Sequence, residues 1–342
     1  MAPLRKLAKR AAITLADTRV GRGFLLRNTA GYVPVFMLHR FTTGDGLVEG
    51  HDPVLVRAAL DYLRSHDFQV LTIDQVVDGL ADGSLPERAV AFTIDDGYRD
   101  QGRVGAELFL ANGCTCTIYL VTELVDGGFW PIESKVRYLF SRAETAFTVR
   151  LRGRDASVAT GDALGQTVMR RQLVYELKAL PLDHAMARVA ELAERMGLNL
   201  PDAPPAGFAP LSWDDVRRLE RRGIAFGTHT LRHVTLSAES DEIAWRELEQ
   251  STRALQVHVD HPSTVFCYPT GRFQDYGPRE IGYLRELGFR AALSSEPGYC
   301  TLGEDADARF NLLRLGFPDS LEEFKDIVLQ LPRLRERWRR RG

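Results

Sequence analysis

Acidic and imidazole side chains that could bind a metal ion occur in two segments that lie far apart in the sequence. Asp95 and Asp96 follow the apolar run at residues 89–93, and His229 and His233 are separated by three residues. Two histidines at positions i and i+4 lie on one face if their segment is helical, and they can then chelate one ion. A carboxylate is the natural third ligand. We therefore expect one of the two aspartates to complete a metal site with the two histidines.

Such a ligand set is suited to hydrolysis. Two imidazoles and one carboxylate leave coordination positions open, and an ion held there polarises an amide carbonyl and lowers the pKa of a bound water toward about 7. Two adjacent carboxylates at the end of an apolar strand each need a partner, so the ion would relieve one and leave the other free to act as a base. Each part also has a structural interpretation, in which the aspartates cap a helix and the histidines bind no metal.

The elements that must position these residues are short apolar strands, which alternate with helical stretches along most of the chain. This alternation predicts parallel strands and an α/β fold. Strands are expected at residues 33–38, 70–73, 89–93, 115–121, 224–227, 264–268 and 291–294, and helices at 53–65, at 240–257 and after Ser320. Polar residues follow four of the strands: His39, the two aspartates, the two histidines and the turn at 269–271. In a parallel barrel the strand ends form one rim, so these groups are expected to converge.

The alternation of strands and helices stops between residues 131 and 205. Leu173, Leu177 and Leu180 share a helix face, and a second amphipathic stripe follows Pro181. We expect a helical insertion over residues 131–205, within a barrel domain that spans residues 31–330. The insertion acts either as a lid over the active site or as a packing appendage without substrate contact.

Composition excludes several classes of protein. The chain has 342 residues, of which 44% are hydrophobic and 26% charged, as is typical of a globular protein. Its net charge is −2, so the chain as a whole lacks the excess of basic residues that nucleic-acid-binding proteins usually have. No apolar run approaches the ~20 residues that span a bilayer. The apolar stretch at residues 11–16 is shorter than the core of a secretory signal, and the four cysteines show no metal-binding spacing. We therefore expect free thiols and a cytoplasmic protein.

Both ends of the chain are rich in basic residues. Those of the N-terminal segment 1–30 and of the C-terminal tail 331–342 are Arg5, Lys6, Lys9, Arg10, Arg19, Arg22 and Arg27, and Arg333, Arg335, Arg337, Arg339, Arg340 and Arg341. A solvated terminus is one interpretation. The other is peripheral contact with an anionic membrane surface, where each basic residue contributes about 1 kcal/mol.

Three motifs, in their order along the chain, resemble the polysaccharide deacetylase family (NodB homology, carbohydrate esterase family 4). They are TIDDG at residues 93–97, GTHTLRH at 227–233 and FCYPTG at 266–271. The segments VPVFMLHR at 33–40 and LSWD at 211–214 are also similar to this family. The resemblance covers roughly residues 31–130 and 206–320, and it leaves the insertion and the termini uncovered.

The resemblance implies a deformed (β/α) barrel of about seven strands and metal-dependent removal of acetyl groups, usually from N-acetylated amino sugars. By position in the motifs, Asp96, His229 and His233 would bind the metal, and Asp95 would be the general base. In the sub-group whose permuted motif comes first, the histidine after the opening strand is the general acid, and His39 matches that position. A divalent ion is implied, and the ligand types favour Zn²⁺.

The sequence departs from the family pattern in the third motif. Cys267 stands where an arginine often pairs with the catalytic aspartate, so we expect Arg314 to take that role, unless it is a surface or packing arginine. Thr270 stands where an aromatic residue is common. Its backbone N–H is still a candidate oxyanion donor, while Tyr268 or Trp130 would supply a face for stacking on a sugar. The Asp-x-x-x-Trp motif of secreted members is not evident.

The sequence thus predicts a hydrolase that removes N-acetyl groups from a saccharide, either a polysaccharide or a lipid-linked or nucleotide-linked intermediate of glycan biosynthesis. Two alternatives stay open. One is an amidohydrolase acting on a non-sugar amide such as a cyclic ureide, and the other is a saccharide-binding protein that has lost catalysis. Comparing activity on acetylated glycans and on ureides distinguishes the amidohydrolase from the deacetylase. Metal analysis together with an assay of acetate release distinguishes the saccharide-binding protein from the deacetylase.

Overall fold

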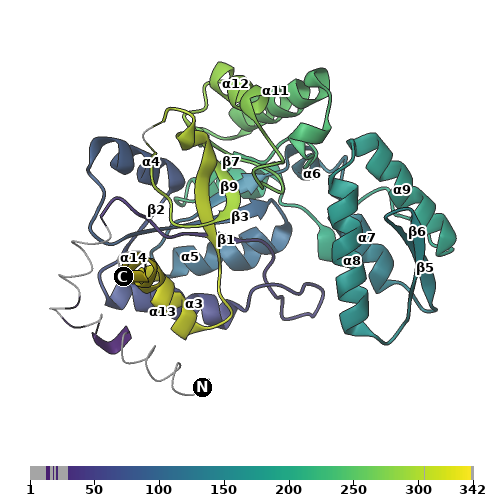
Figure 1. The fold of residues 1–342 in the computed structure, drawn as a ribbon, viewed down its shortest axis with the longest axis horizontal. Helices are drawn as coiled ribbons and strands as arrows, with labels where there is room; N and C mark the ends of the chain where they lie inside the picture. The colour runs from purple at the N-terminus through teal and green to yellow at the C-terminus, as the bar shows by residue number, and fades with distance from the viewer. Residues whose placement is uncertain (1–12, 16–17, 19–20, 22–29, 304, 340–342) are drawn as a thin grey trace.

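Seven parallel strands form a curved, barrel-like sheet at the centre of the molecule (Figure 1). The computed structural model describes residues 13–15, 18, 21, 30–303 and 305–339. Across the gap between the two terminal strands of the sheet, the Ser263 N–H donates to the Phe226 carbonyl at 2.7 Å. The fold is therefore a nearly closed, deformed β/α barrel, which confirms the predicted fold class. In spatial order the strands are β7 (Ala225–Thr228), β4 (Thr117–Leu120), β3 (Ala89–Asp96), β1 (Val35–Leu38), β10 (Leu312–Gly316), β9 (Ala291–Pro297) and β8 (Val265–Cys267), with β2 (Gln69–Leu71) paired to β3 outside this order.

Alternate side chains of the strands pack on opposite faces of the sheet. All eight residues of β3 are buried, as expected of a parallel strand with both faces covered. Phe36 on β1 and Phe92 on β3 stack with ring centroids 5.4 Å apart. They belong to a hydrophobic cluster that also includes side chains of the helices outside the barrel. Their neighbours Val35 and Ala91 belong to a second cluster, inside the barrel.

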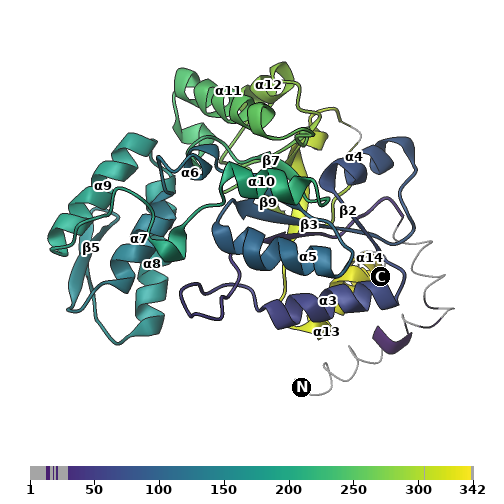
Figure 2. The same cartoon turned by 180° about the vertical axis from the view of Figure 1, so that it is seen from behind.

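Helices cover the outside of the barrel (Figure 2). The Asp52 side chain accepts from the Val54 N–H at the start of α3, and the Ser320 hydroxyl accepts from the Glu323 N–H at the start of α13. The helices predicted at 53–65, at 240–257 and after Ser320 are all present. The helices are α3 (Pro53–Ser65), α4 (Ile73–Asp82), α5 (Glu107–Ala111), α6 (Thr122–Val125), α10 (Trp213–Glu220), α11 (Asp241–His258), α12 (Pro278–Glu286), α13 (Leu321–Val328) and α14 (Leu331–Arg339).

The insertion at 131–205 lies beside the barrel, on the right in Figure 1, and it is not purely helical. Besides α7 (Ile132–Ser141), α8 (Ala163–Lys178) and α9 (Leu182–Arg195), it contains the antiparallel hairpin of β5 (Phe147–Leu151) and β6 (Arg154–Val158). The prediction of a helical insertion missed this hairpin. Each of its strands has only five residues, which is too short for the alternation of apolar and polar residues to be recognised. Arg152 and Gly153 connect the strands with φ of 48° and 72°, the left-handed backbone of a two-residue hairpin turn.

The described part of the basic C-terminal tail is helix α14, which contacts the barrel. Arg335 forms an ion pair with Asp326, and the Arg333 guanidinium lies 3.2 Å from the Tyr32 ring centroid. The other basic residues on which the membrane prediction rests lie outside the described residues and side chains. Among the described residues, no helix combines the length and the apolar character needed to cross a membrane. All four cysteines are free thiols.

Candidate active site

The two aspartates lie where β3 ends and the chain turns sharply. Asp96 has φ of 98° and the following Gly97 has φ of 96°, and such a conformation is costly for a residue with a side chain. The buried side chain of Gln101, at the start of a π-helical segment (Gln101–Ala106), accepts from the Gly97 and Tyr98 N–H groups at 2.8 and 3.1 Å and donates to the Asp95 carbonyl. This loop is therefore held in the strained conformation that directs both carboxyl groups.

The two histidines follow β7 in an irregular loop rather than in a helical turn, so the condition under which their spacing places them on one helix face is not met. Thr230 and His233 have φ of 64° and 60°, and the His233 N–H donates to the Thr230 hydroxyl at 2.9 Å. The imidazole rings of His229 and His233 nevertheless meet, with centroids 4.9 Å apart. The loop conformation, not a helix face, brings them together.

Asp96, His229 and His233 form a buried group that could hold a divalent metal ion. Their ligand atoms all lie within 4.8 Å of one another, and Asp96 Oδ1 is 3.5 Å from His233 Nε2 and 3.9 Å from His229 Nε2. These separations exceed hydrogen-bond lengths but suit three ligands around an ion at about 2.0–2.2 Å from each. Asp96 Oδ1 is buried and has no hydrogen-bond partner among the described residues. An unpartnered buried carboxylate oxygen is costly, so the donor set fits a cation.

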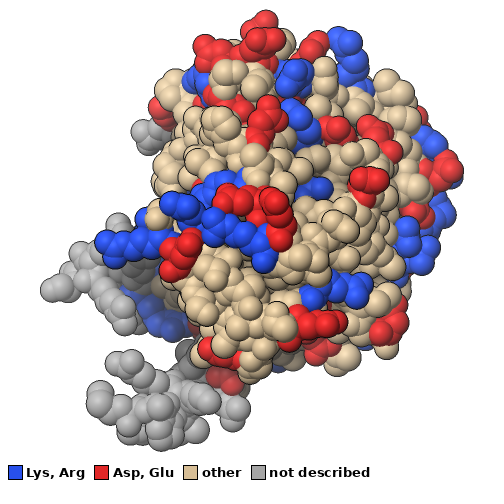
Figure 3. Space-filling model, turned by 90° about the vertical axis from the view of Figure 1, so that its right-hand side faces the viewer, with Lys and Arg blue, Asp and Glu red and all other residues tan. Residues whose placement is uncertain are grey.

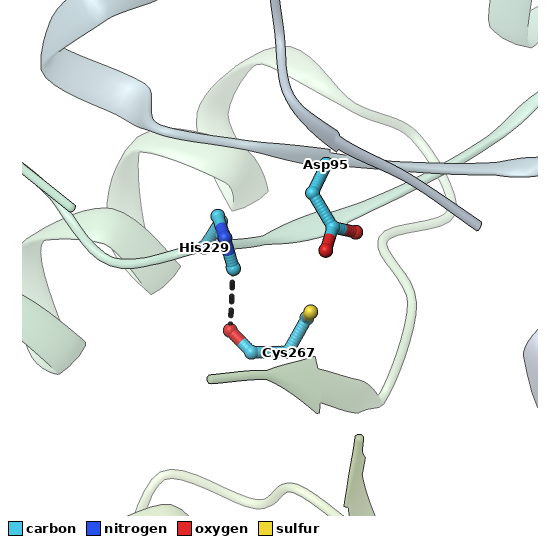
Figure 4. A group of neighbouring side chains, drawn as sticks. All are labelled: Asp95, His229 and Cys267. Carbon is cyan, nitrogen blue, oxygen red and sulfur yellow. Dashed lines mark hydrogen bonds between the residues drawn. The ribbon is translucent and has the colours of Figure 1, made fainter. Parts of the chain in front are cut away.

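The protonation of these groups agrees with metal binding. Burial lowers the pKa of His229 to about 3, so its imidazole is neutral, as a ligand must be. Its Nδ1–H donates to the Cys267 carbonyl at 2.7 Å (Figure 4), which leaves the lone pair on Nε2 for an ion. Burial raises the pKa of Asp96 above its usual value, and a bound cation would oppose that effect.

A second group, Asp95, His229 and Cys267, also has its ligand atoms within 4.8 Å of one another (Figure 4). Its chemistry is less suited to a metal ion, because burial raises the pKa of Cys267 well above its usual value and keeps the thiol neutral. Asp95 already has a cationic partner. The unpartnered oxygen of Asp96 favours the first group.

That partner is Arg314, which lies on β10 and is 2% exposed. Its Nη1 donates to Asp95 Oδ1 at 2.9 Å and to the Thr93 hydroxyl at 3.0 Å, and its Nε donates to the Ser294 carbonyl at 2.8 Å. Burial alone would raise the pKa of Asp95. The charge of Arg314, with smaller contributions from His229 and His39, instead holds that pKa well below its usual range. Asp95 is therefore ionised at neutral pH.

His39 follows β1 and lies on the open side of the site. Its Nε2 is 4.0 Å from Asp95 Oδ2, and its side chain is 46% exposed. An imidazole that is half exposed and close to the buried carboxylates can contact a substrate and still exchange protons with water.

The turn after β8 places Thr270 at the site with φ of 61°. Its hydroxyl lies 3.3 Å from that of Thr235, and its carbonyl accepts from the Ser295 hydroxyl. Within the described chain no group accepts a hydrogen bond from its N–H, which leaves this donor available for an oxyanion.

The two aromatic residues expected to stack on a sugar are both buried. Tyr268 is 1% exposed and stacks on Tyr276 with centroids 3.7 Å apart. Trp130 is 0% exposed and packs against Phe208 and Tyr138. The expectation for Trp130 was wrong, since none of its surface is available, and one face of the Tyr268 ring is already occupied.

Sequence analysis missed Glu133, which the insertion contributes from α7. Its Oε1 lies 2.9 Å from His233 Nδ1 and 3.2 Å from the Lys178 ammonium. Burial would raise the pKa of Glu133, but His233 and Lys178 hold it well below the usual range. The two atoms approach closely without an aligned hydrogen bond, and a carboxylate in this place behind a histidine helps to orient its ring. No spacing or motif connects Glu133 with His233, 100 residues further along the chain.

These groups line a cavity of about 430 Å³ at the carboxyl ends of the strands. Its size is within the range of small-ligand sites. The insertion supplies part of the wall, so it contacts the site. The charged, imidazole and threonine side chains in its wall are His39, Arg40, Asp95, Asp96, His229, His233, Thr270, Arg272 and Arg314, with Glu133, Arg137, Arg170 and Lys178 from the insertion.

Comparison with known families identifies this arrangement. The family model described as "Polysaccharide deacetylase" matches residues 82–292, which is more than half of the chain. The chain belongs to the polysaccharide deacetylase family. The matched region contains both aspartates, both histidines and the turn at Thr270. No curated protein matches the sequence significantly.

Several solved structures share the fold of this chain. A *Streptococcus pyogenes* deacetylase, PplD, in complex with acetate, has 15% identity and a TM-score of 0.57, over 87% of this chain and 98% of its own. IcaB from *Ammonifex degensii* has 15% identity and a TM-score of 0.54, over 88% and 97%. A de-N-acetylase from *Aggregatibacter actinomycetemcomitans* has 13% identity and a TM-score of 0.53, over 86% and 99%. At these identities the similarity shows the fold alone.

Proposed function

We propose that this deacetylase removes N-acetyl groups from an amino-sugar-containing saccharide in a metal-dependent hydrolysis. The observation that carries the proposal is the buried group of Asp96, His229 and His233 beside an aspartate that Arg314 keeps ionised. This arrangement combines a site for a Lewis acid with a separate base, as amide hydrolysis requires.

In this proposal the side chains of Asp96, His229 and His233 would hold a divalent ion, which the ligand types suggest is Zn²⁺. When bound, such an ion polarises the amide carbonyl and acidifies water. Glu133 acts behind His233 as a positioning residue. The Cys267 carbonyl has the same function behind His229.

Asp95 accepts the proton of the attacking water. Arg314 keeps its carboxylate ionised and fixed by hydrogen bonds, so the base needs no rearrangement before the reaction. The Thr270 N–H donates to the oxyanion that forms from the carbonyl.

His39 donates a proton to the departing amine, because an amide anion is a poor leaving group. The support for this role is its position after β1, with Nε2 4.0 Å from Asp95 and the ring half exposed. The role also assigns the chain to the sub-group with the permuted histidine motif. Assignment to that sub-group is part of the proposal.

The substrate class rests on the family and on the names of the related structures, which include a de-N-acetylase and a deacetylase with acetate. We infer that the substrate is an N-acetylated saccharide, either a polysaccharide or a glycan biosynthetic intermediate. Contact with a membrane and a cytoplasmic location stay predictions.

The decisive experiment measures acetate release from acetylated glycans, with and without chelator and after Zn²⁺ is restored. Release that chelator stops, that Zn²⁺ restores and that Asp95→Asn lowers by at least ~100-fold is expected. Hydrolysis of a cyclic ureide without acetate release would instead favour the amidohydrolase. Metal binding without acetate release from any glycan would favour a saccharide-binding protein.

A further inference from the structure

Five basic side chains line the cavity beyond the groups used in the proposed reaction. Arg40 follows β1, Arg137 comes from α7, Arg170 and Lys178 come from α8, and Arg272 comes from the turn after β8. Three of the five therefore belong to the insertion, although α7 and α8 are separated by the β5–β6 hairpin. The question is whether acidic residues of the chain neutralise these charges.

Three of the five cations are neutralised by nearby carboxylates. Arg40 lies 2.8 Å from the buried Asp100. Lys178 lies 3.2 Å from Glu133, which is a positioning residue of the site, and Arg272 lies 3.2 Å from Glu296. These pairs account for their presence in the cavity wall without any ligand.

The other two cations are not matched in the same way. Arg137 lies 3.3 Å from Glu49, whose side chain is 90% exposed, and an ion pair with so exposed a carboxylate is weak. No residue in the described part of the chain forms an ion pair with Arg170. Burial, and then the charges of Arg137 and Arg171, lower the pKa of Arg170, and the charge of Glu49 opposes them as the smallest of these contributions. Two guanidinium groups thus lie near each other at the cavity with little compensating charge.

The excess of positive charge is local to the cavity. Figure 3 shows the side of the molecule that carries the insertion, and there basic and acidic side chains are interspersed over the surface. A general affinity of this face for polyanions would need a continuous basic field instead. The unmatched pair of arginines indicates a specific anionic ligand group.

We propose that the saccharide substrate carries an anionic oxygen group, a phosphate or a carboxylate, and that Arg137 and Arg170 bind it while the acetamido group lies at the catalytic residues. Guanidinium groups recognise both anions through paired, charge-assisted hydrogen bonds. This inference rests on the proposed function, since it specifies the substrate of the same cavity. The insertion then acts in substrate selection as well as in packing.

The test compares three small acetylated sugars: N-acetylglucosamine 1-phosphate, N-acetylmuramic acid as the carboxylate, and the neutral methyl glycoside of N-acetylglucosamine. Calorimetry on the chelator-treated full chain measures binding without turnover and without a metal that could hold the anion. At least one anionic sugar is expected to bind about tenfold or more tightly than the neutral one. The sugar that shows this preference identifies the source of the anion.

The variants make the result specific to the two arginines. Arg170→Gln should abolish most of the preference, Arg170→Lys should retain part of it, and Arg137→Gln should reduce it. The matched control is Arg171→Gln, which removes the same charge from the neighbouring exposed position of α8 and should change binding less than twofold. With Zn²⁺ restored, Arg170→Gln should raise KM for the anionic sugar about tenfold and leave kcat nearly unchanged.

Equal affinity for all three sugars, or equal effects of Arg170→Gln and Arg171→Gln, would overturn the inference. These outcomes are separable from failure of the proposed function. Acetate release from neutral glycans with no preference for anions supports the function and refutes the anion site. Binding of an anionic sugar that depends on Arg170, with no acetate release from any glycan, supports the anion site and refutes the proposed function.

Discussion

Replacing Arg314 with methionine tests the electrostatic basis of the site. The side chains of Arg314 and Asp95 are 1% and 2% exposed, and they are 2.9 Å apart. Methionine has a similar length and can fill the space, but it leaves the Asp95 carboxylate without a cation. The variant therefore isolates the effect of an unpaired buried charge.

The magnitude follows from burial. Removing one partner of a buried ion pair costs about 3–5 kcal/mol, because the remaining charge is neither solvated nor paired. The substitution also removes the hydrogen bond from Arg314 to the Ser294 carbonyl, so we expect the upper part of this range. Asp95→Asn in the same background removes the charge and should recover at least ~2 kcal/mol.

The pH dependence has a defined sign. In the wild type, pairing holds the pKa of Asp95 below its unfolded value of about 3.9, so the stability from the pair is present above that value and is lost as the pH falls below it. In Arg314→Met, burial without a cation raises the folded pKa above the unfolded value, and this destabilisation is relieved by protonation. The difference in stability between wild type and variant should be largest near pH 7 and shrink as the pH falls.

The assay is urea unfolding of chelator-treated protein, followed by circular dichroism at several pH values. Arg253→Met is the control, because Arg253 on α11 is 74% exposed and its ion pair with Glu249 should contribute no more than ~1 kcal/mol. The reasoning is refuted if Arg314→Met unfolds like the control, if Asp95→Asn gives no recovery, or if the difference grows on acidification.

Three further predictions concern other parts of the molecule. Glu133→Gln should weaken metal affinity about 10–100-fold through His233, measured by competition with a chromogenic chelator, whereas Glu49→Gln should have no effect. Gly97→Ala should destabilise the fold by about 1–3 kcal/mol in thermal unfolding, because its φ is 96° and a Cβ would lie 2.9 Å from a leucine side chain. Gly113→Ala, with φ of 66° and no atom within 4 Å of a Cβ, should cost no more than ~1–2 kcal/mol. The chain should float with anionic liposomes at low salt and dissociate at high salt, and a protein that stays in the unbound fraction at low salt would contradict the membrane prediction.

Sequence predicted best where the signal is local. The buried runs of β3 and β4 and the polar residues that follow the strands were recognisable, because apolar composition and turn residues mark such segments without knowledge of their partners. Convergence of Asp96 with His229 required only the rule that parallel strand ends share a rim.

The features that were missed depend on long-range contacts or weak patterns. Strand β10 was not predicted, although Arg314 within it was proposed as the partner of Asp95, 219 residues away. The hairpin was too short to show its alternation. The contact of Glu133 with His233 depends on how α7 packs beside the barrel, and no local pattern in the sequence encodes that placement.

The contact between Glu133 and His233 has a consequence for engineering this protein. Because one carboxylate ties the insertion to the catalytic loop, the insertion is not a removable module. Deleting the insertion would remove the carboxylate beside the His233 imidazole and one wall of the active-site cavity. Transferring the insertion to another barrel would transfer its selectivity only if its glutamate contacted the corresponding histidine of that barrel. The insertion also shares a hydrophobic cluster with the barrel, so a change of specificity in this chain would have to preserve both the carboxylate contact and that packing.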